Sequence, residues 1–189
     1  MAASSGERVT NGNVVRGLLA ELKARGLFEV VRAGVSPEAQ AMMDSPPLHI
    51  AWVSSHPYEE LFDRLGELFG REKVQEIAYG CTLNTIGPLI TPLIRTYIKL
   101  SGASLATTLG HMGSAVAVQY RGVQLDYQPD TDHSTYLTMR FPDPVSDFIY
   151  ASWEGAFRYG KELTGSPSFT IGRFEIFEGG KAGRVYIQW

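Results

Sequence analysis

The sequence predicts an α+β domain in which an N-terminal helical half packs on a C-terminal four-stranded antiparallel sheet. Up to about residue 112, apolar residues recur at helical spacing, and from about residue 116 they alternate with a period of two. One helical segment interrupts the alternating part. The second half therefore has the order strand, strand, helix, strand, strand, which is typical of helices packed on one antiparallel sheet.

Composition places the chain among ordinary globular proteins. Its 189 residues are enough for one domain with a sizeable core, since domains run from about 50 to 250 residues. Hydrophobic residues make up 44%, charged residues 20%, and the formal net charge is -3. These values give no basic footprint for nucleic acid or for an anionic membrane, so we expect no nucleic-acid partner.

Cysteine usage and the N-terminus bear on the compartment. Cys81 is the only cysteine, which excludes an intramolecular disulfide and a zinc site built mainly on thiolates. The N-terminus lacks a basic segment followed by an apolar one, and no apolar run approaches the roughly 20 residues that a spanning helix needs. We therefore expect a cytoplasmic protein without membrane insertion.

The N-terminal half begins after a polar segment. Residues 1–12 are small and polar and are expected to be disordered, so that a single domain covers residues 13–189. Helical spacing of apolar residues begins near Val14 and ends near Gly26, and a further apolar segment runs from Leu27 to Val35.

The clearest helix start in the chain is His56-Pro57, because proline is favoured in the first turn of a helix. The apolar residues that follow have the spacing of one helix face, and Gly70 ends the helix. The next helix carries Cys81 on its apolar face, so this cysteine is predicted to be a small core residue. The pair Glu59-Glu60 and the run Arg71-Glu72-Lys73 are predicted to be solvated helix faces.

Two more helices are predicted over residues 89–100 and 103–112. The first is apolar nearly all round, so it belongs in the interior or against a ligand. The second carries His111 at its C-terminal end, between Gly110 and Gly113. Glycines in these positions permit close approach by a bulky group.

One strand is predicted over residues 116–127, in two parts, 116–120 and 123–127. Their alternation has opposite parity on the two sides of Arg121-Gly122, which implies a bulge or a tight turn there. A polar loop over residues 128–133 leads to a strand over 134–141.

A helix begins after Pro144, where the preceding strand has ended. Two further strands follow over residues 169–177 and 184–189. The residues between them are rich in glycine and predict a hairpin loop.

The candidate ligand site combines His111 with the strand residues Tyr136, Thr138 and Arg140. Side chains alternate faces along a strand, so these three should project from one side, toward whatever His111 faces. Neutral imidazole is a good iron ligand, and an arginine beside two hydroxyls suits a pair of carboxylates. The apolar walls of the predicted pocket come from Leu93, Tyr97, Leu105 and Leu109.

Each of these residues also has an ordinary structural interpretation. His111 could cap a helix C-terminus, where positive charge is stabilised. Threonine and tyrosine are good strand formers, and an arginine near a strand end is commonly solvated. Only the combination with His111 raises the set above these alternatives.

Other sites are disfavoured. Three histidines and two aspartates could supply metal ligands, but the sequence Asp-Thr-Asp-His in a loop is more often a turn. These residues are His49, His56, Asp130, Asp132 and His133. The chain has no serine-hydrolase elbow, no Walker or Rossmann glycine loop and no zinc-protease motif, so we expect no enzymatic activity.

Along residues 14–189 the sequence resembles an uncharacterised paralogous family that is expanded in myxobacteria. The resemblance rests on a Gly-Leu-Leu helix near the N-terminus, on the helix start His56-Pro57-Tyr58, and on the ending Val185-Tyr-Ile-Gln-Trp189. The resemblance implies no particular function.

A second resemblance is to the haem nitric oxide/oxygen-binding (H-NOX) domains and, through shared architecture, to vinyl-reductase-like ligand-sensing domains and TRAPP-type trafficking subunits. H-NOX domains have a similar length and the same order of elements. They ligate haem iron through a histidine and bind the propionates with a Tyr-x-Ser-x-Arg strand motif. Here His111 stands in a comparable place, and Tyr136-Leu-Thr138-Met-Arg140 resembles that motif with threonine in place of serine.

The resemblance implies a non-catalytic sensory or ligand-binding domain with an apolar pocket between helices and sheet. Haem bound through His111 is the leading candidate ligand, and a haem-free pocket for an apolar carboxylate is the close variant. The signal would pass to a separate signalling protein. The alternative is a haem-free protein-interaction adaptor of the TRAPP-like type, with a filled interior and an exposed apolar patch on the order of several hundred Å². Both interpretations allow a homodimer.

Overall fold

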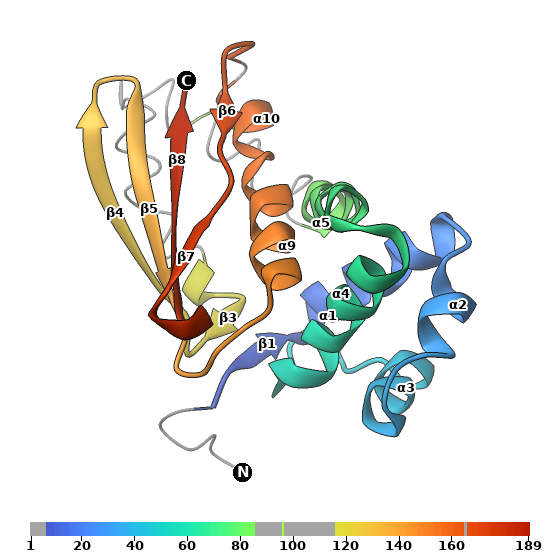
Figure 1. The fold of residues 1–189 in the computed structure, drawn as a ribbon. Coiled ribbons are helices and arrows are strands. Elements are labelled where there is room, and N and C mark those ends of the chain that lie inside the picture. Colours follow the sequence, from blue (N-terminus) through green and yellow to red (C-terminus); the bar gives the residue numbers. More distant parts are fainter. Residues whose placement is uncertain (1–6, 86–95, 97–115, 165) are drawn as a thin grey trace.

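The computed structural model describes residues 7–85, 96, 116–164 and 166–189 (Figure 1). Helices occupy the first half and an antiparallel sheet the second, so the predicted α+β class is confirmed. The predicted helices over residues 89–100 and 103–112 lie outside the described residues, apart from Thr96, which is helical.

Five helices are described in the N-terminal half. They are α1 (Gly12–Ala24), α2 (Phe28–Arg32), α3 (Pro37–Asp44), α4 (Ser55–Phe69) and α5 (Arg71–Thr85). The Asn11 side chain accepts a hydrogen bond from the Asn13 amide (2.9 Å) at the start of α1. Gly70, with φ +81°, separates α4 from α5, as the sequence predicted.

A small sheet joins the N-terminus to the middle of the chain. Val9–Asn11, which we expected to lie in a disordered segment, form strand β1. β1 pairs with β2 (Trp52–Ser54) on one side and with β3 (Tyr120–Arg121) on the other. Both pairings are antiparallel and involve only two or three residues per strand, which is too short for an alternating pattern to be recognised.

The first part of that predicted strand, residues 116–120, is wrong. Val116 and Ala117 are helical, a turn follows, and only Tyr120–Arg121 are extended. Val118 is 69% exposed, so the valines that suggested alternation do not share a buried sheet face. The predicted turn at Gly122 is present, with φ +80°.

The C-terminal sheet has five strands where we predicted four. Its order is β4 (Gln124–Thr131), β5 (Ser134–Arg140), β8 (Ala182–Gln188) and β6 (Thr170–Ile171), and β7 (Glu175–Phe177) also pairs with β8. The single strand predicted over residues 169–177 is therefore two strands. Residues 172–174 between them are not strand, and the Phe174 amide donates to the carboxylate of Glu154 (2.6 Å).

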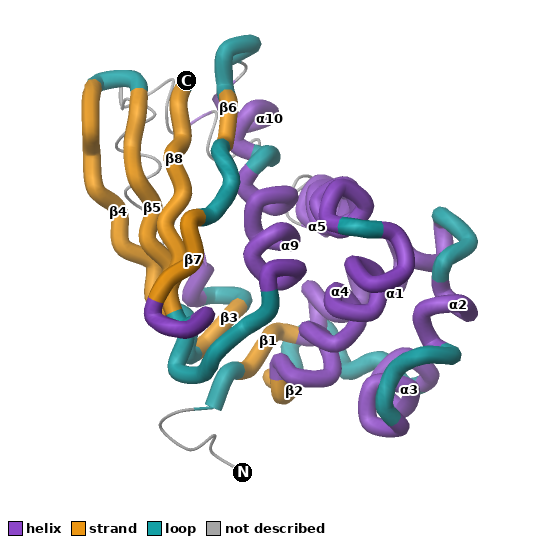
Figure 2. The backbone as a smooth tube through the Cα atoms, in the orientation of Figure 1, coloured by secondary structure: helices purple, strands orange, loops and turns teal. Residues whose placement is uncertain are grey.

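Helix α9 (Asp147–Phe157) lies between the sheet and the N-terminal helices (Figures 1 and 2). Its Tyr150 ring lies directly over Gly183 of β8, where an added Cβ would come within 2.5 Å of the ring. On its other side, Gly155 meets α5 so closely that an added Cβ would lie 2.2 Å from the Gln75 carbonyl oxygen. One hydrophobic core runs through these contacts from the helices to the sheet.

The short helix α10 (Gly160–Thr164) follows α9, and the single turn of 3-10 helix η1 (Glu178–Gly180) joins β7 to β8. Among the described residues, none of the helices combines the length and apolar character that a membrane crossing needs.

Candidate functional site

A partly enclosed cavity of about 140 Å³ lies among α1, α4, α5, α9 and the segment 116–123. Most of the described side chains that line it are apolar or aromatic. They include Val14, Phe62, Ala78, Cys81, Val123, Phe141, Ile149, Trp153, Phe157 and Leu163. Such a lining is typical of sites for small organic molecules.

Tyr120 is the residue that connects the small sheet to the cavity. Its backbone pairs with Thr10 of β1, which fixes the position of its side chain between two helices. The ring centroid lies 4.7 Å from that of Trp153 on α9 and 6.4 Å from that of Tyr58 on α4. Tyr58 in turn meets Phe62 edge-on at 5.3 Å. These rings form a continuous aromatic wall on the cavity.

Two tyrosine hydroxyls form the polar contact in this wall. The hydroxyl oxygens of Tyr58 and Tyr120 are 3.3 Å apart, and either can be the donor. Burial raises the pKa of Tyr58 and of Tyr120 above the ordinary tyrosine value, since the charged form would be desolvated. Both hydroxyls therefore keep their protons at neutral pH.

The remaining titratable groups on the described lining carry little net charge. Burial raises the pKa of the Cys81 thiol to about 12, so Cys81 is a neutral core residue, as predicted. Glu59 is held by Arg8, whose Nε and Nη2 donate to its two carboxylate oxygens at 3.1 and 2.7 Å. The Arg8 side chain is only 2% exposed. Glu59 is therefore one half of a buried ion pair, not the solvated residue that we predicted.

The sequence-predicted site residues fall into two groups. His111, Leu93, Tyr97, Leu105 and Leu109 lie outside the described residues, and their roles stay predictions. Tyr136, Thr138 and Arg140 do share one face of β5, as the strand alternation predicts.

That face of β5 is the one opposite the core. Leu137 and Met139 alternate with the predicted residues and are fully buried. The Arg140 side chain is 42% exposed, and its guanidinium pairs with Glu178 (2.8 Å) and with Asp126 (3.9 Å). Tyr136 contacts the ring of Tyr186 at 5.1 Å. None of the three lines the cavity, so the described structure does not bring this set and the cavity together.

The described residues also contain no group of three or more histidine, cysteine or acidic side chains arranged to hold a metal ion. His133 lies in the turn between β4 and β5, where its amide donates to the Thr131 hydroxyl (3.2 Å). His49 faces Asn13, with Nδ1 3.2 Å from the amide oxygen.

Sequence reasoning missed Tyr58, Tyr120 and Trp153 as a set. Tyr58 was recognised as part of a buried helix face, but its partner Tyr120 is 62 residues away, on the strand β3 that pairs with β1. No local pattern in the sequence predicts that pairing.

No protein-family model matches the sequence, and no curated protein matches it closely. The fold is nevertheless similar to those of solved structures. The Fe(II) unliganded H-NOX protein from K. algicida matches with a TM-score of 0.69, at 14% identity, over 94% of this chain and 95% of that one. An H-NOX structure solved to probe the function of heme distortion gives 0.63, at 13% identity, over 95% and 94%. An oxygen-binding H-NOX domain related to soluble guanylate cyclases, in its oxygen complex, gives 0.61, at 13% identity, over 94% of each chain. The chain therefore has the H-NOX fold.

Proposed function

We propose that this chain is a non-catalytic ligand-binding domain of the sensory kind, and that the cavity among α1, α4, α5 and α9 is its ligand site. The observation that carries the proposal is the cavity itself. Protein interiors are normally packed with few voids larger than a water molecule. A hollow of about 140 Å³ beside an otherwise dense core is room for a small molecule.

Helix α9 contacts both the cavity and the sheet. Ile149 and Trp153 line the cavity from one side of α9, and Tyr150 packs over Gly183 of the sheet from the other. A ligand that favours one position of α9 would shift the contact of this helix with the sheet. The sheet would then present the change to a separate signalling protein.

A cavity-filling substitution tests the proposed site. Ala78 is a buried cavity-lining residue of α5, so Ala78→Leu adds bulk inside the hollow. We expect the parent chain to bind toluene saturably, as measured by calorimetry or by tryptophan fluorescence, and Ala78→Leu to bind at least tenfold more weakly. The matched control is Ala24→Leu, which adds the same bulk at an exposed position of α1. Unchanged toluene binding by Ala78→Leu would place the ligand elsewhere.

Haem is the group that the fold implies, and the described residues do not fit it. Haem needs an iron ligand and partners for two propionates. The described lining of the cavity includes no histidine, lysine or arginine. Arg140, the predicted propionate partner, is on the opposite face of β5 and is paired with acidic side chains.

Haem held by His111 is nevertheless the second candidate, and the fold favours it. The similar structures include an Fe(II) H-NOX protein and an H-NOX domain in complex with oxygen. The test is an absorption spectrum of the chain expressed with excess haem, beside the His111→Ala variant. A stoichiometric Soret band that is lost in the variant would support ligation by His111. No stable band would remove this candidate and leave the haem-free ligand site.

The TRAPP-like adaptor stays a prediction. It calls for a filled interior, and the cavity favours ligand binding over it.

A further inference from the structure

We infer that the cavity takes a small, neutral ring compound that carries one hydrogen-bond acceptor, and that the Tyr58 and Tyr120 hydroxyls recognise this acceptor. The inference rests on the proposed function, since it names the chemical class of ligand for the same cavity. Size, wall chemistry, charge and hydrogen-bond count each limit the class.

Size limits the ligand to a single ring with a small substituent. The cavity volume is about 140 Å³. An apolar cavity of about 150 Å³ in another protein holds benzene or xenon. A molecule of two or more fused rings would exceed this space.

The walls favour a flat ring. Tyr120 and Trp153 are 4.7 Å apart between centroids, and Trp153 and Phe157 are 5.7 Å apart, so three rings follow one another along the cavity. Aromatic rings prefer offset-stacked or edge-to-face contacts at such separations. A planar guest can make either contact with this wall.

The charges on the described lining disfavour an ionised ligand. Glu59 is the one carboxylate on the described lining, and Arg8 already neutralises it through two hydrogen bonds. Cys81 is a protonated thiol within reach of the Val14 carbonyl oxygen, at 3.8 Å. A carboxylate or an ammonium group on the ligand would be desolvated with no described counter-ion left to pair with it.

The number of protons on the two tyrosine hydroxyls indicates that the ligand carries a hydrogen-bond acceptor. The two hydroxyls carry two protons, and the hydrogen bond between them uses one. Neither hydroxyl has another partner among the described residues, so one O–H remains to donate. Their separation of 3.3 Å is long for two hydroxyls, which commonly lie at about 2.7 to 2.8 Å, so the pair can open toward a ligand atom.

Four ring compounds of similar size test the inference on the full chain: toluene, benzonitrile, benzoate and benzylammonium. Benzonitrile has an acceptor and no donor, toluene has neither, and the other two are charged. We expect benzonitrile to bind about tenfold more tightly than toluene, as one net hydrogen bond implies, and the two ions to bind more weakly than toluene. Dissociation constants come from calorimetry.

The variant that removes both hydroxyls, Tyr58→Phe with Tyr120→Phe, should bind toluene as the parent does and lose its preference for benzonitrile. Tyr150→Phe is the matched control, because it deletes a hydroxyl that donates to the Gly180 carbonyl oxygen away from the cavity. The control should keep the preference.

The outcomes separate the two proposals. If toluene binds but the parent shows no preference for benzonitrile, or if benzoate or benzylammonium binds as tightly as benzonitrile, the ligand class is wrong while the cavity stands as a ligand site. Retention of the preference in the double variant would also overturn the role of the hydroxyls. If none of the four binds, the proposed ligand site itself fails.

Discussion

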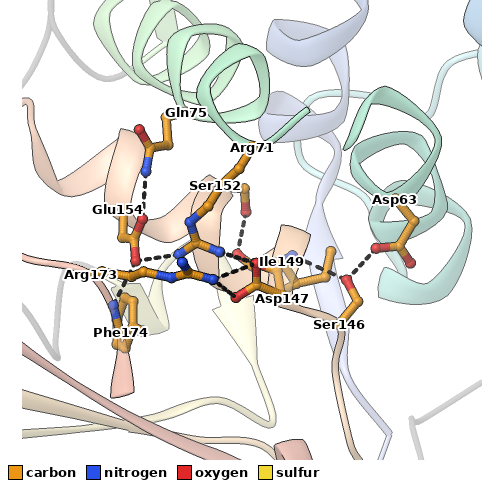
Figure 3. Close-up of polar contacts among 10 residues, drawn as sticks. All are labelled: Asp63, Arg71, Gln75, Ser146, Asp147, Ile149, Ser152, Glu154, Arg173 and Phe174. Carbon is orange, nitrogen blue, oxygen red and sulfur yellow. Dashed lines mark hydrogen bonds and ion pairs between the residues drawn. The ribbon is translucent and has the colours of Figure 1, made fainter. Parts of the chain in front are cut away.

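Helix α9 separates two buried regions of opposite chemistry. On one side is the cavity, with neutral walls and one hydroxyl proton that has no described acceptor. On the other is a network centred on Glu154, whose side chain is 1% exposed (Figure 3). Its carboxylate accepts hydrogen bonds from Arg71 (2.5 Å), Gln75 (2.6 Å) and the Phe174 amide (2.6 Å). Trp153 and Glu154 are neighbours in the sequence, yet Trp153 lines the cavity and Glu154 lies in the network.

The difference indicates which of the two regions can change its contacts when a ligand binds. A buried carboxylate is tolerated only when its lone pairs are occupied, and Glu154 meets this condition with partners from α5 and from the chain between β6 and β7. Arg71 also donates to the Asp147 carbonyl oxygen (2.9 Å) at the start of α9. These bonds hold together α5, α9 and the segment between β6 and β7. Apart from the Glu59–Arg8 pair, the described lining of the cavity has no such requirement, so its contacts can change when a ligand enters.

The largest expected effect comes from breaking the network. Arg71→Ala leaves Glu154 buried without its cation, and we expect the free energy of unfolding to fall by about 3 kcal/mol, the usual cost of removing one partner of a buried pair. Urea denaturation measures this change. The control is Arg184→Ala, which removes an exposed pair with Glu175 and should cost less than about 1 kcal/mol. Equal losses in the two variants would mean that the network has no special role.

A smaller effect is expected where α9 meets α5 beside this network. Gly155→Ala places a Cβ 2.2 Å from the Gln75 carbonyl oxygen, so the helices must separate. Overpacking of this kind costs about 1 to 3 kcal/mol. At Gly172 an added Cβ would meet the Tyr186 carbonyl oxygen at an ordinary 3.5 Å, so Gly172→Ala serves as the control in the same denaturation experiment. A Gly155→Ala chain as stable as the parent would show that α9 can move away from α5 freely.

Sequence periodicity was sufficient for the larger elements of both regions. The apolar face of α4 and its end at Gly70 were predicted, as were strand β5 and the helix that became α9. In each case the spacing of apolar residues within one segment predicts which side chains of that element are buried. The shared face of Tyr136, Thr138 and Arg140 followed from the same alternation.

What could not be predicted depends on contacts between distant residues. Arg71 was predicted to be solvated, but its side chain is 17% exposed and its partner Glu154 is 83 residues away. The alternation in β5 likewise does not say which of its two faces the helices cover. In the structure Tyr150 of α9 packs over Gly183 of β8, and Arg140 lies on the far face from the cavity.

The smallest expected effect concerns Asp63, a carboxylate near the network that has no cationic partner among the described residues. Asp63 accepts a hydrogen bond from the Ser146 hydroxyl (Figure 3). Burial raises its pKa, the negative charges of Glu59, Glu67 and Glu60 add to this, and the Ser146 bond opposes it. A carboxyl group whose pKa is raised by folding destabilises the folded state above that pKa, and the penalty disappears as the pH falls through it.

Replacing Asp63 by asparagine should therefore raise the free energy of unfolding at about pH 7, by a small amount, and make no difference below about pH 3, where the acid is protonated in both states. Asp44→Asn is the control of opposite sign, because the hydrogen bond from Arg32 lowers the pKa of Asp44. That variant should lose stability at neutral pH, and the loss should shrink as the pH falls through the lowered pKa. Urea denaturation across this pH range measures both. A destabilised Asp63→Asn chain at neutral pH would mean that the bond from Ser146 outweighs the burial of the charge, and that this carboxylate is as well satisfied as Glu154.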